Sequence, residues 1–226
     1  MKKGDENLEA ERGYQLDVGF NWQKKRWLAK LSPFFNYFHN FIYLAPTGRF
    51  TTLPRSSGQV HQYRQAEALH SGSELTIDYH VLNNLHLGMI ADVVLGHNLE
   101  EDRPLPQTPP ATLRFDAEYE YTLDGKVLRE FFVAASTRLV SKQTRTERNE
   151  FETPGYHLID LSIGGELFSE DYPWKVLVHV RNLTDNDYFN HLSRFRLLNL
   201  PEPGRNVVVT LRIPLLNVAP KRHQHE

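Results

Sequence analysis

The chain contains no cysteine among its 226 residues. Disulfides, thiolate metal sites and a cysteine nucleophile are therefore excluded within it. No apolar run approaches the length of about 18 residues that a transmembrane helix requires. The mean hydropathy of −0.52 is that of a soluble protein, but a transmembrane barrel has a similar average because its strands alternate apolar and polar residues.

Charge and catalytic motifs are also scarce. Lysine and arginine number 26 and aspartate and glutamate 28, so the chain has no strong field and we expect no nucleic-acid partner. The GxSxG, HExxH, GxxxxGK(S/T) and GxGxxG motifs are missing, which favours a protein that is not an enzyme and holds no cofactor. The opening MKKGDENLEAERGYQ lacks the apolar core of a signal peptide. We therefore expect either a cytosolic protein or a piece of a longer one.

Alternation of apolar and polar residues runs through most of the sequence, whereas helical periodicity is rare. The stretch ATLRFDAEYEY (residues 111–121) places Leu, Phe, Ala and Tyr on one face of a strand and Arg, Asp and Glu on the other. This pattern predicts an all-β protein of about nine antiparallel strands. They are Tyr14–Gln23, Trp27–Leu44, Val60–Leu82, Leu85–Gly96, Ala111–Leu123, Leu128–Ser141, Tyr156–Phe168, Trp174–Arg181 and Asn206–Ile213. Phe34 and Phe38 fall on the polar face of the second strand.

The links between these strands alternate in length. The short ones are KKR, NN, DG and SEDYP, and Asn-Asn and Asp-Gly suit two-residue turns because both tolerate positive φ. The long ones are APTGRFTTLPRSSGQ, HNLEEDRPLPQTPP, KQTRTERNEFETPG and residues 182–204. Short turns at one end and long loops at the other are typical of an outer-membrane barrel, with periplasmic turns and extracellular loops.

Aromatic residues give a second indication of a membrane barrel. At the short-turn end, the apolar face is predicted to carry Trp22, Trp27, Tyr119, Tyr121 and Trp174. At the other end, Tyr14, Phe41 and Tyr43 have the same parity. Aromatic belts at both interfaces suit strands that contact lipid. The polar face would then line a wet lumen with Arg114, Asp116, Glu118, Glu120, Lys175, His179, Arg181 and Arg212.

The alternative is a soluble β-sandwich or lectin-like domain that binds a ligand with loops gathered at one end. A sandwich buries its apolar faces inside one molecule. Its three tryptophans need not lie at one level, whereas those of a membrane barrel should.

Four segments of the sequence carry recognisable motifs. Near the C-terminus these are Asn182-Leu183-Thr184-Asp185, Tyr188, and then Pro203-Gly204-Arg205 before an amphipathic strand. RPLPQTPPATLRFDAEYEY has a Leu-Pro…Pro-Pro approach to a descending strand, VHQYRQAEALHSGSEL a Tyr-x-Asn/Gln…Gly-x-Glu strand, and GDENLEAERGYQLDVGFNW is similar to an Asn-x-x-Leu-x-x-Glu stretch. In this order the four segments resemble TonB-dependent outer-membrane receptors. NHLSRFR and IPL look more like receptors of Bacteroidetes-type bacteria.

The resemblance implies the C-terminal part of a barrel of about 22 strands in the outer membrane of a Gram-negative bacterium. Residues 1–215 would be barrel and 216–226 a periplasmic tail. The implied partners are lipid, the plug domain and the TonB complex through a missing N-terminal part, and a small ligand: a siderophore or other metal complex, haem, a metal ion or cobalamin. The family usually ends on an aromatic residue, whereas here RIPL is followed by LNVAPKRHQHE.

The predicted outer loops hold the candidate ligand-binding residues. Arginines among aromatics suit an anionic, partly apolar ligand, acidic residues suit a cation, and histidines suit a metal or haem. The candidates are His61, His97, Glu100, Glu101, Asp102, Tyr188, His191, Arg194 and Arg196. Alternatively these residues are solvated, or the arginines pair with lumen carboxylates. The histidines contain no i, i+2 pair on one strand face, so their spacing predicts no particular metal site.

Overall fold

The structure, a computed structural model, describes residues 2–3, 6–52, 58–123, 128–167 and 174–213. Twelve strands and one short 3-10 helix, η1 (Arg194–Leu198), make up this part of the chain. The strands are β1 (Lys2–Lys3), β2 (Arg12–Asp17), β3 (Phe20–Lys24), β4 (Trp27–Thr51), β5 (Gly58–Leu82), β6 (Leu85–Asn98), β7 (Arg103–Pro104), β8 (Thr112–Thr122), β9 (Leu128–Val140), β10 (Tyr156–Leu167), β11 (Trp174–Arg181) and β12 (Asn206–Arg212).

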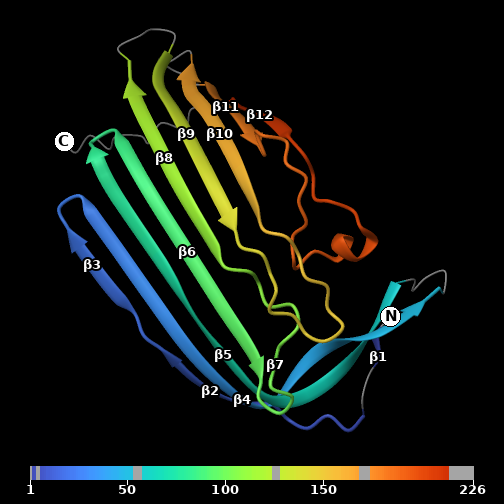
Figure 1. The fold of residues 1–226 in the computed structure, drawn as a ribbon. Coiled ribbons are helices and arrows are strands. Elements are labelled where there is room, and N and C mark those ends of the chain that lie inside the picture. Colours follow the sequence, from blue (N-terminus) through green and yellow to red (C-terminus); the bar gives the residue numbers. More distant parts are fainter. Residues whose placement is uncertain (1, 4–5, 53–57, 124–127, 168–173, 214–226) are drawn as a thin grey trace, which may run out of the picture.

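All twelve strands belong to one sheet, which curves without closing on itself (Figure 1). Its order is β12-β11-β10-β9-β8-β6-β5-β4-β2, with β3 on β4, β7 on β6 and β1 on β5. Every pairing is antiparallel except that of β1 with β5. The predicted all-β class is confirmed. No second sheet covers the first within the described residues, so the sandwich alternative is not supported.

The first predicted strand is divided into β2 and β3, both paired with β4. The break at Val18–Gly19 lies opposite Ser32–Pro33, between the pairs Asp17–Phe34 and Phe20–Leu31. Pro33 has no N–H to donate, so the ladder loses a hydrogen bond at this point. One bond remains, from the Val18 N–H to the Pro33 carbonyl at 3.1 Å.

The hairpin of β4 and β5 is longer than the sequence predicted, because each strand has 25 residues. Most of the expected long loop after the second strand is therefore strand. A bulge at His39–Asn40 separates the pairs Phe38–Ala68 and Phe41–Ala66, and Asn40 has a positive φ of 56°. The sequence could not reveal this shift of one residue, which reverses the faces of everything that follows in β4.

The bulge makes the prediction for Phe41 and Tyr43 wrong. Instead of joining an interface belt, both lie on the polar side of the sheet with Phe38, and Tyr43 is 8% exposed. The small core formed there consists of Tyr43, Ala45, Ala66, Ala68 and Leu105, with Phe38 and Phe41 against it.

Phe34 and Phe38, the two phenylalanines that the sequence places on the polar face of β4, each stand opposite a glycine. Phe34 pairs with Gly72 of β5, and Phe38 pairs with Gly13 of β2. A Cβ added to Gly13 would lie 2.9 Å from the Phe38 ring. An aromatic ring laid over a cross-strand glycine fills the space left by the missing side chain, which explains why these residues break the alternation.

The sheet separates short links from long ones, as the sequence predicted. Lys25–Arg26 and Asn83–Asn84 turn at one end, and the links 99–111, 141–155 and 182–205 lie at the other (Figure 1). The predicted Asp-Gly and Ser-Glu-Asp-Tyr-Pro turns and the tail 216–226 lie outside the described residues. No helix in the described part of the chain is long and apolar enough to cross a membrane.

Candidate functional site

The apolar face of the sheet carries large exposed side chains on most strands. Trp22, Trp27, Tyr119, Tyr121 and Trp174, the five predicted interface aromatics, are all partly exposed and lie toward the short-turn end. Trp27 stacks on Tyr79 with ring centroids 4.0 Å apart. Their role at a membrane interface remains a prediction. An apolar face this extensive requires a covering partner that the described residues do not supply.

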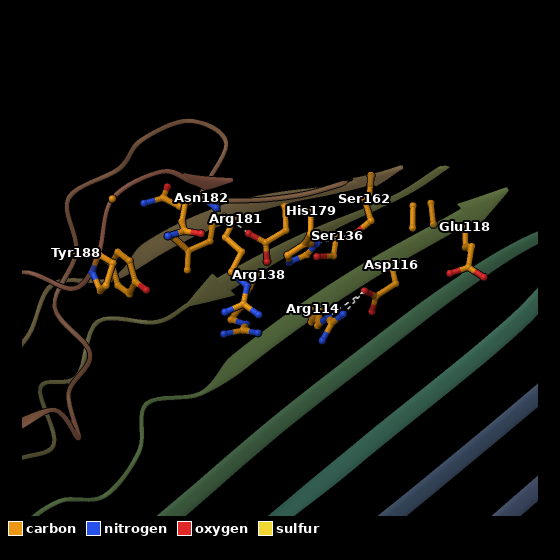
Figure 2. A pocket seen from close by; sticks show the side chains of 18 residues that line it. Arg114, Asp116, Glu118, Ser136, Arg138, Ser162, His179, Arg181, Asn182 and Tyr188 are labelled. Atoms are coloured by element: carbon orange, nitrogen blue, oxygen red, sulfur yellow. Dashed lines mark hydrogen bonds and ion pairs between the residues drawn. The ribbon is translucent and has the colours of Figure 1, made fainter. Parts of the chain in front are cut away.

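The polar face bears a cavity of about 790 Å³, formed by β8, β9, β10, β11, the link 182–205 and the first residue of β12 (Figure 2). Five of the eight predicted lumen residues line it, and Glu120, Lys175 and Arg212 do not. The charged and polar side chains of the lining are Arg114, Asp116, Glu118, Ser136, Arg138, Asp160, Ser162, His179, Arg181, Asn182, Tyr188 and Asn206. The cavity therefore joins the predicted lumen wall to Tyr188 of the last long link.

Charge pairing in this cavity is incomplete. Arg114 donates to Asp116 Oδ1 from Nε at 2.8 Å and from Nη2 at 2.6 Å, and both side chains point into the cavity (Figure 2). Arg138, which stands directly opposite Arg114, and Arg181 form no ion pair within the described residues. Like charges on directly facing strand positions are destabilising. Arg138 was not among the predicted lumen residues, because Phe132 and Ala134 share its face of β9 and make the alternation of this strand weak.

The acidic residues of the link 99–111 do not converge on one point. Glu101 lies 3.4 Å from the Arg64 guanidinium, and Asp102 lies 3.0 Å from His97. Glu100 accepts the Glu67 N–H at 3.2 Å. The structure therefore distributes these carboxylates among different partners, and Asp102 remains 95% exposed at its side chain. No group of three or more histidines and carboxylates in the described ranges is arranged to hold a metal.

A buried ionic junction connects the links 141–155 and 182–205. Glu150 Oε1 lies 3.0 Å from Arg196 Nη2 and 3.2 Å from His191 Nε2. The exposed fractions of the three side chains are 4%, 9% and 1%. The Glu150 oxygen does not lie along the direction in which His191 Nε2 would donate, so this contact is electrostatic and requires a protonated ring. The other ring nitrogen, His191 Nδ1, lies 3.0 Å from the Thr153 hydroxyl.

Further bonds extend this junction to other links. The Gln107 N–H donates to Glu150 Oε1 at 2.9 Å, and Arg196 Nη1 donates to the Phe151 carbonyl at 2.8 Å. Asn149 donates to the Pro46 carbonyl at 3.1 Å and accepts from Gln59 at 2.9 Å, which attaches the link to the β4–β5 hairpin. Four chain segments distant in sequence are thus held together at the long-link end.

The environment of Glu150 favours its ionised form. Burial would raise the pKa of this carboxyl, but the contacts from His191 and the N–H groups of Gln107 and Glu147 outweigh burial and lower it below its usual range. Glu150 is consequently a buried anion in contact with the Arg196 guanidinium and the His191 ring.

A small cavity of about 30 Å³ beside the junction brings together four of the predicted ligand residues, His61, His191, Arg194 and Arg196. His191 and Arg196 direct their polar atoms toward Glu150, whereas Arg194 is exposed. Tyr188 lies apart from this group and packs on Tyr156 with ring centroids 4.5 Å apart. Ligand binding by these residues remains a prediction, with Arg194 exposed and Tyr188 half-buried.

The sequence matches the family described as TonB dependent receptor-like, beta-barrel, over residues 2–183. The chain therefore belongs to this family of receptor barrels. The match ends as the Asn182-Leu183-Thr184-Asp185 motif begins. The finer resemblance to Bacteroidetes-type receptors has no support from these matches.

Solved structures give the same fold. The chain is similar to the copper transporter OprC with 24% identity and a TM-score of 0.76, over 92% of this chain and 33% of that one. It is similar to the FrpB iron transporter of Neisseria meningitidis with 17% identity and a TM-score of 0.67, over 93% and 33%. It is similar to a mutant ferric enterobactin receptor of Pseudomonas aeruginosa with 18% identity and a TM-score of 0.66, over 93% of this chain and 32% of that one. The chain spans about a third of the length of these structures.

Proposed function

We propose that this chain is the C-terminal part of the barrel of a TonB-dependent receptor in the outer membrane of a Gram-negative bacterium, where it takes part in importing a metal complex or cofactor. The observation that carries the proposal is the open sheet with one exposed apolar face and links sorted by length. Both outer edges, at β12 and at β2 and β3, lack a further strand in the described residues. Such edges and such a face are stable when more strands close a barrel in lipid.

The orientation follows from the links. The short turns face the periplasm, and the links 99–111, 141–155 and 182–205 face the outside. The five short-turn aromatics then lie at the periplasmic interface and the cavity of Figure 2 opens into the lumen. The plug and the TonB-contacting segment come from the remainder of the receptor, and this chain supplies wall and loops.

The ligand class that the chain favours is an anionic metal chelate. Arg194 and Phe195 are exposed together on η1, and Arg138 and Arg181 of the lumen wall form no ion pair with any other described residue. Guanidinium groups bind carboxylate and catecholate oxygens, and aromatic faces bind the apolar parts of a chelator. Ferric siderophores and haem fit this description better than a bare cation does. A cationic or neutral ligand such as cobalamin is the second candidate, served by the exposed Asp102.

The test uses bacteria that carry or lack the complete gene. The protein should fractionate with the outer membrane, and growth on one ferric siderophore or haem as the sole iron source should require it. Arg194→Ala should weaken uptake about tenfold, the value of one charge-assisted contact. Arg148→Ala, an exposed arginine of the link 141–155, is the matched control. A protein found in the soluble fraction, or uptake indifferent to the gene for every chelate, would reject the proposal.

A further inference from the structure

His80 and His86 face each other across β5 and β6, next to the turn Asn83–Asn84. Their ring centroids are 4.4 Å apart and the rings are nearly perpendicular, with an interplanar angle of 79°. Both belong to the polar face, at the short-turn end and far from the ionic junction of the long links.

A β-bulge produces this alignment. Leu82 pairs with Leu85, and the next pair is His80 with His86, so Val81 is an extra residue in β5. In an unbulged hairpin with the same turn, His86 would stand opposite Val81 and the two histidines would not meet. Bulges commonly redirect a side chain near functional sites. The spacing of the histidines in the sequence therefore concealed the pair.

Arg26, in the neighbouring turn between β3 and β4, holds the bulge in place. Its Nη1 donates to the Val81 carbonyl at 2.6 Å, and its own carbonyl accepts the His80 N–H at 2.9 Å. Because the N–H of His80 points toward β4, the pair with His86 is a non-hydrogen-bonded one. Side chains approach each other most closely at such pairs.

Two carboxylates neighbour the histidine pair on the polar face. Glu118 of β8 stands opposite His86, and Asp78 precedes His80 by two residues on the same face. Neither forms an ion pair within the described residues. Gly88 leaves space between Asp78 and Asp116, since a Cβ there would lie 3.7 and 3.8 Å from one oxygen of each. Among the described residues, these carboxylates and the two histidines do not form a site of three or more metal ligands.

We propose that His80 and His86 bind one divalent transition-metal ion through their two imidazoles, with water in the remaining positions. Imidazole suits Cu²⁺, Ni²⁺ and Zn²⁺, and two nitrogens at about 2.0 Å from one ion lie at most about 4 Å apart. Ring centroids 4.4 Å apart allow one nitrogen of each ring to approach this separation by rotation about χ1 and χ2. Asp78 and Glu118 contribute negative charge, which attracts the cation and offsets the nearby Arg26.

The site goes beyond the proposed import of an anionic chelate, because it binds the bare ion and exists whatever the cargo is. It lies on the polar face at the end opposite to the long links. If that face lines the lumen, the ion binds close to the periplasmic exit.

The test is Cu²⁺ binding by the receptor expressed from its complete gene and purified in detergent. In every sample His223 and His225 of the tail are replaced by Gln, because they could bind copper independently. The electron paramagnetic resonance spectrum should show coupling to two imidazole nitrogens. His80→Gln or His86→Gln should reduce this to one nitrogen and weaken binding about tenfold or more, since the second ligand acts intramolecularly.

His179→Gln is the matched control. His179 lies on the same face and in the same cross-strand row, but its partner is the Ser162 hydroxyl at 2.6 Å. It should leave both the affinity and the spectrum unchanged. The proposal would be overturned if the His80 and His86 variants bound Cu²⁺ as tightly as the receptor that keeps both histidines. It would also be overturned if the His179 variant lost as much affinity for Cu²⁺ as they do. Because uptake of a chelate is measured separately, either proposal can fail without the other.

Discussion

Asp185 holds Arg205 across the base of the last long link. Its Oδ1 accepts the backbone N–H of Arg205 at 2.7 Å, and its Oδ2 lies 3.6 Å from the Arg205 guanidinium. Gly204 allows this approach, because a Cβ there would lie 2.7 Å from Asp185 Oδ1. The two halves of the motif that resembles TonB-dependent receptors, Asn-Leu-Thr-Asp and Pro-Gly-Arg, are thus parts of one local structure.

Replacing Asp185 should open the link 182–205. Asp185→Ala removes the acceptor of the Arg205 N–H and the ion pair, at a cost of about 1 kcal/mol for a partly exposed group. Tryptic cleavage at Arg194 and Arg196 should accelerate roughly fivefold, since opening becomes that much more frequent. Asp187→Ala, at an exposed carboxylate of the same link, should leave the rate of cleavage unchanged. A rate unaltered in the Asp185 variant would show that the motif does not hold the link.

Neutralising Glu150 should loosen the links more severely. Glu150→Gln keeps the shape of the side chain but leaves Arg196 and His191 beside a neutral partner, and removing one member of a buried pair costs about 3 kcal/mol. Proteolysis of the links 141–155 and 182–205 should increase together. Glu152→Gln is the control, because Glu152 pairs with Lys142 at 3.0 Å on the surface. If the links open independently, the junction does not connect them.

Acid should weaken the same junction. The pKa of Glu150 lies below its ordinary value of 4.5, so its stabilising contribution is complete above that pH and is lost as the pH falls through the lower, folded pKa. Hydrogen exchange, corrected for the intrinsic effect of pH, should increase in both links below about pH 4.5. The Glu150→Gln variant should lack this step. A step at higher pH, or an equal step in the variant, would contradict the assignment to Glu150.

The glycine beneath Phe38 gives a test of packing on the polar face. Gly13→Ala would place its Cβ 2.9 Å from the Phe38 ring, at a cost of about 1–3 kcal/mol for an overpacked site. In the double variant, Phe38→Leu should relieve much of this cost. A double-mutant cycle that compares the thermal stability of the single and double variants in detergent measures this relief. Gly19→Ala, with nothing within 4 Å of the new Cβ, is the control. Additive costs would mean that the ring and the glycine are not coupled.

Strand alternation and link lengths predicted the all-β class, the nine principal strands and the sorting of links. These features depend on local sequence, since period-two patterning fixes the faces and asparagine pairs mark turns. The failures came from single-residue shifts. The bulge at His39–Asn40 moved Phe41 and Tyr43 to the other face, and the bulge at Val81 aligned His80 with His86. A bulge depends on pairing across strands and leaves little trace in one of them.

The candidate site was less predictable than the fold. The sequence identified Arg196 and His191 as loop residues with polar chemistry, but their common partner Glu150 is more than 40 residues away in the chain. Arg138 was not predicted because both faces of β9 mix polar and apolar residues, so that alternation did not distinguish its lumen side. Contacts between long links depend on how the whole sheet curves, and residue spacing does not encode that curvature.

Cysteine labelling tests directly whether the long links lie on the outer side of an outer membrane, because the chain contains no cysteine of its own. Asp102→Cys, at a fully exposed position of the link 99–111, should react with an impermeant maleimide on intact cells. Asn83→Cys, in the turn between β5 and β6, should react only after the outer membrane is permeabilised. The reverse pattern, or equal labelling of positions 102 and 83 in intact cells, would show that the long links do not lie outside.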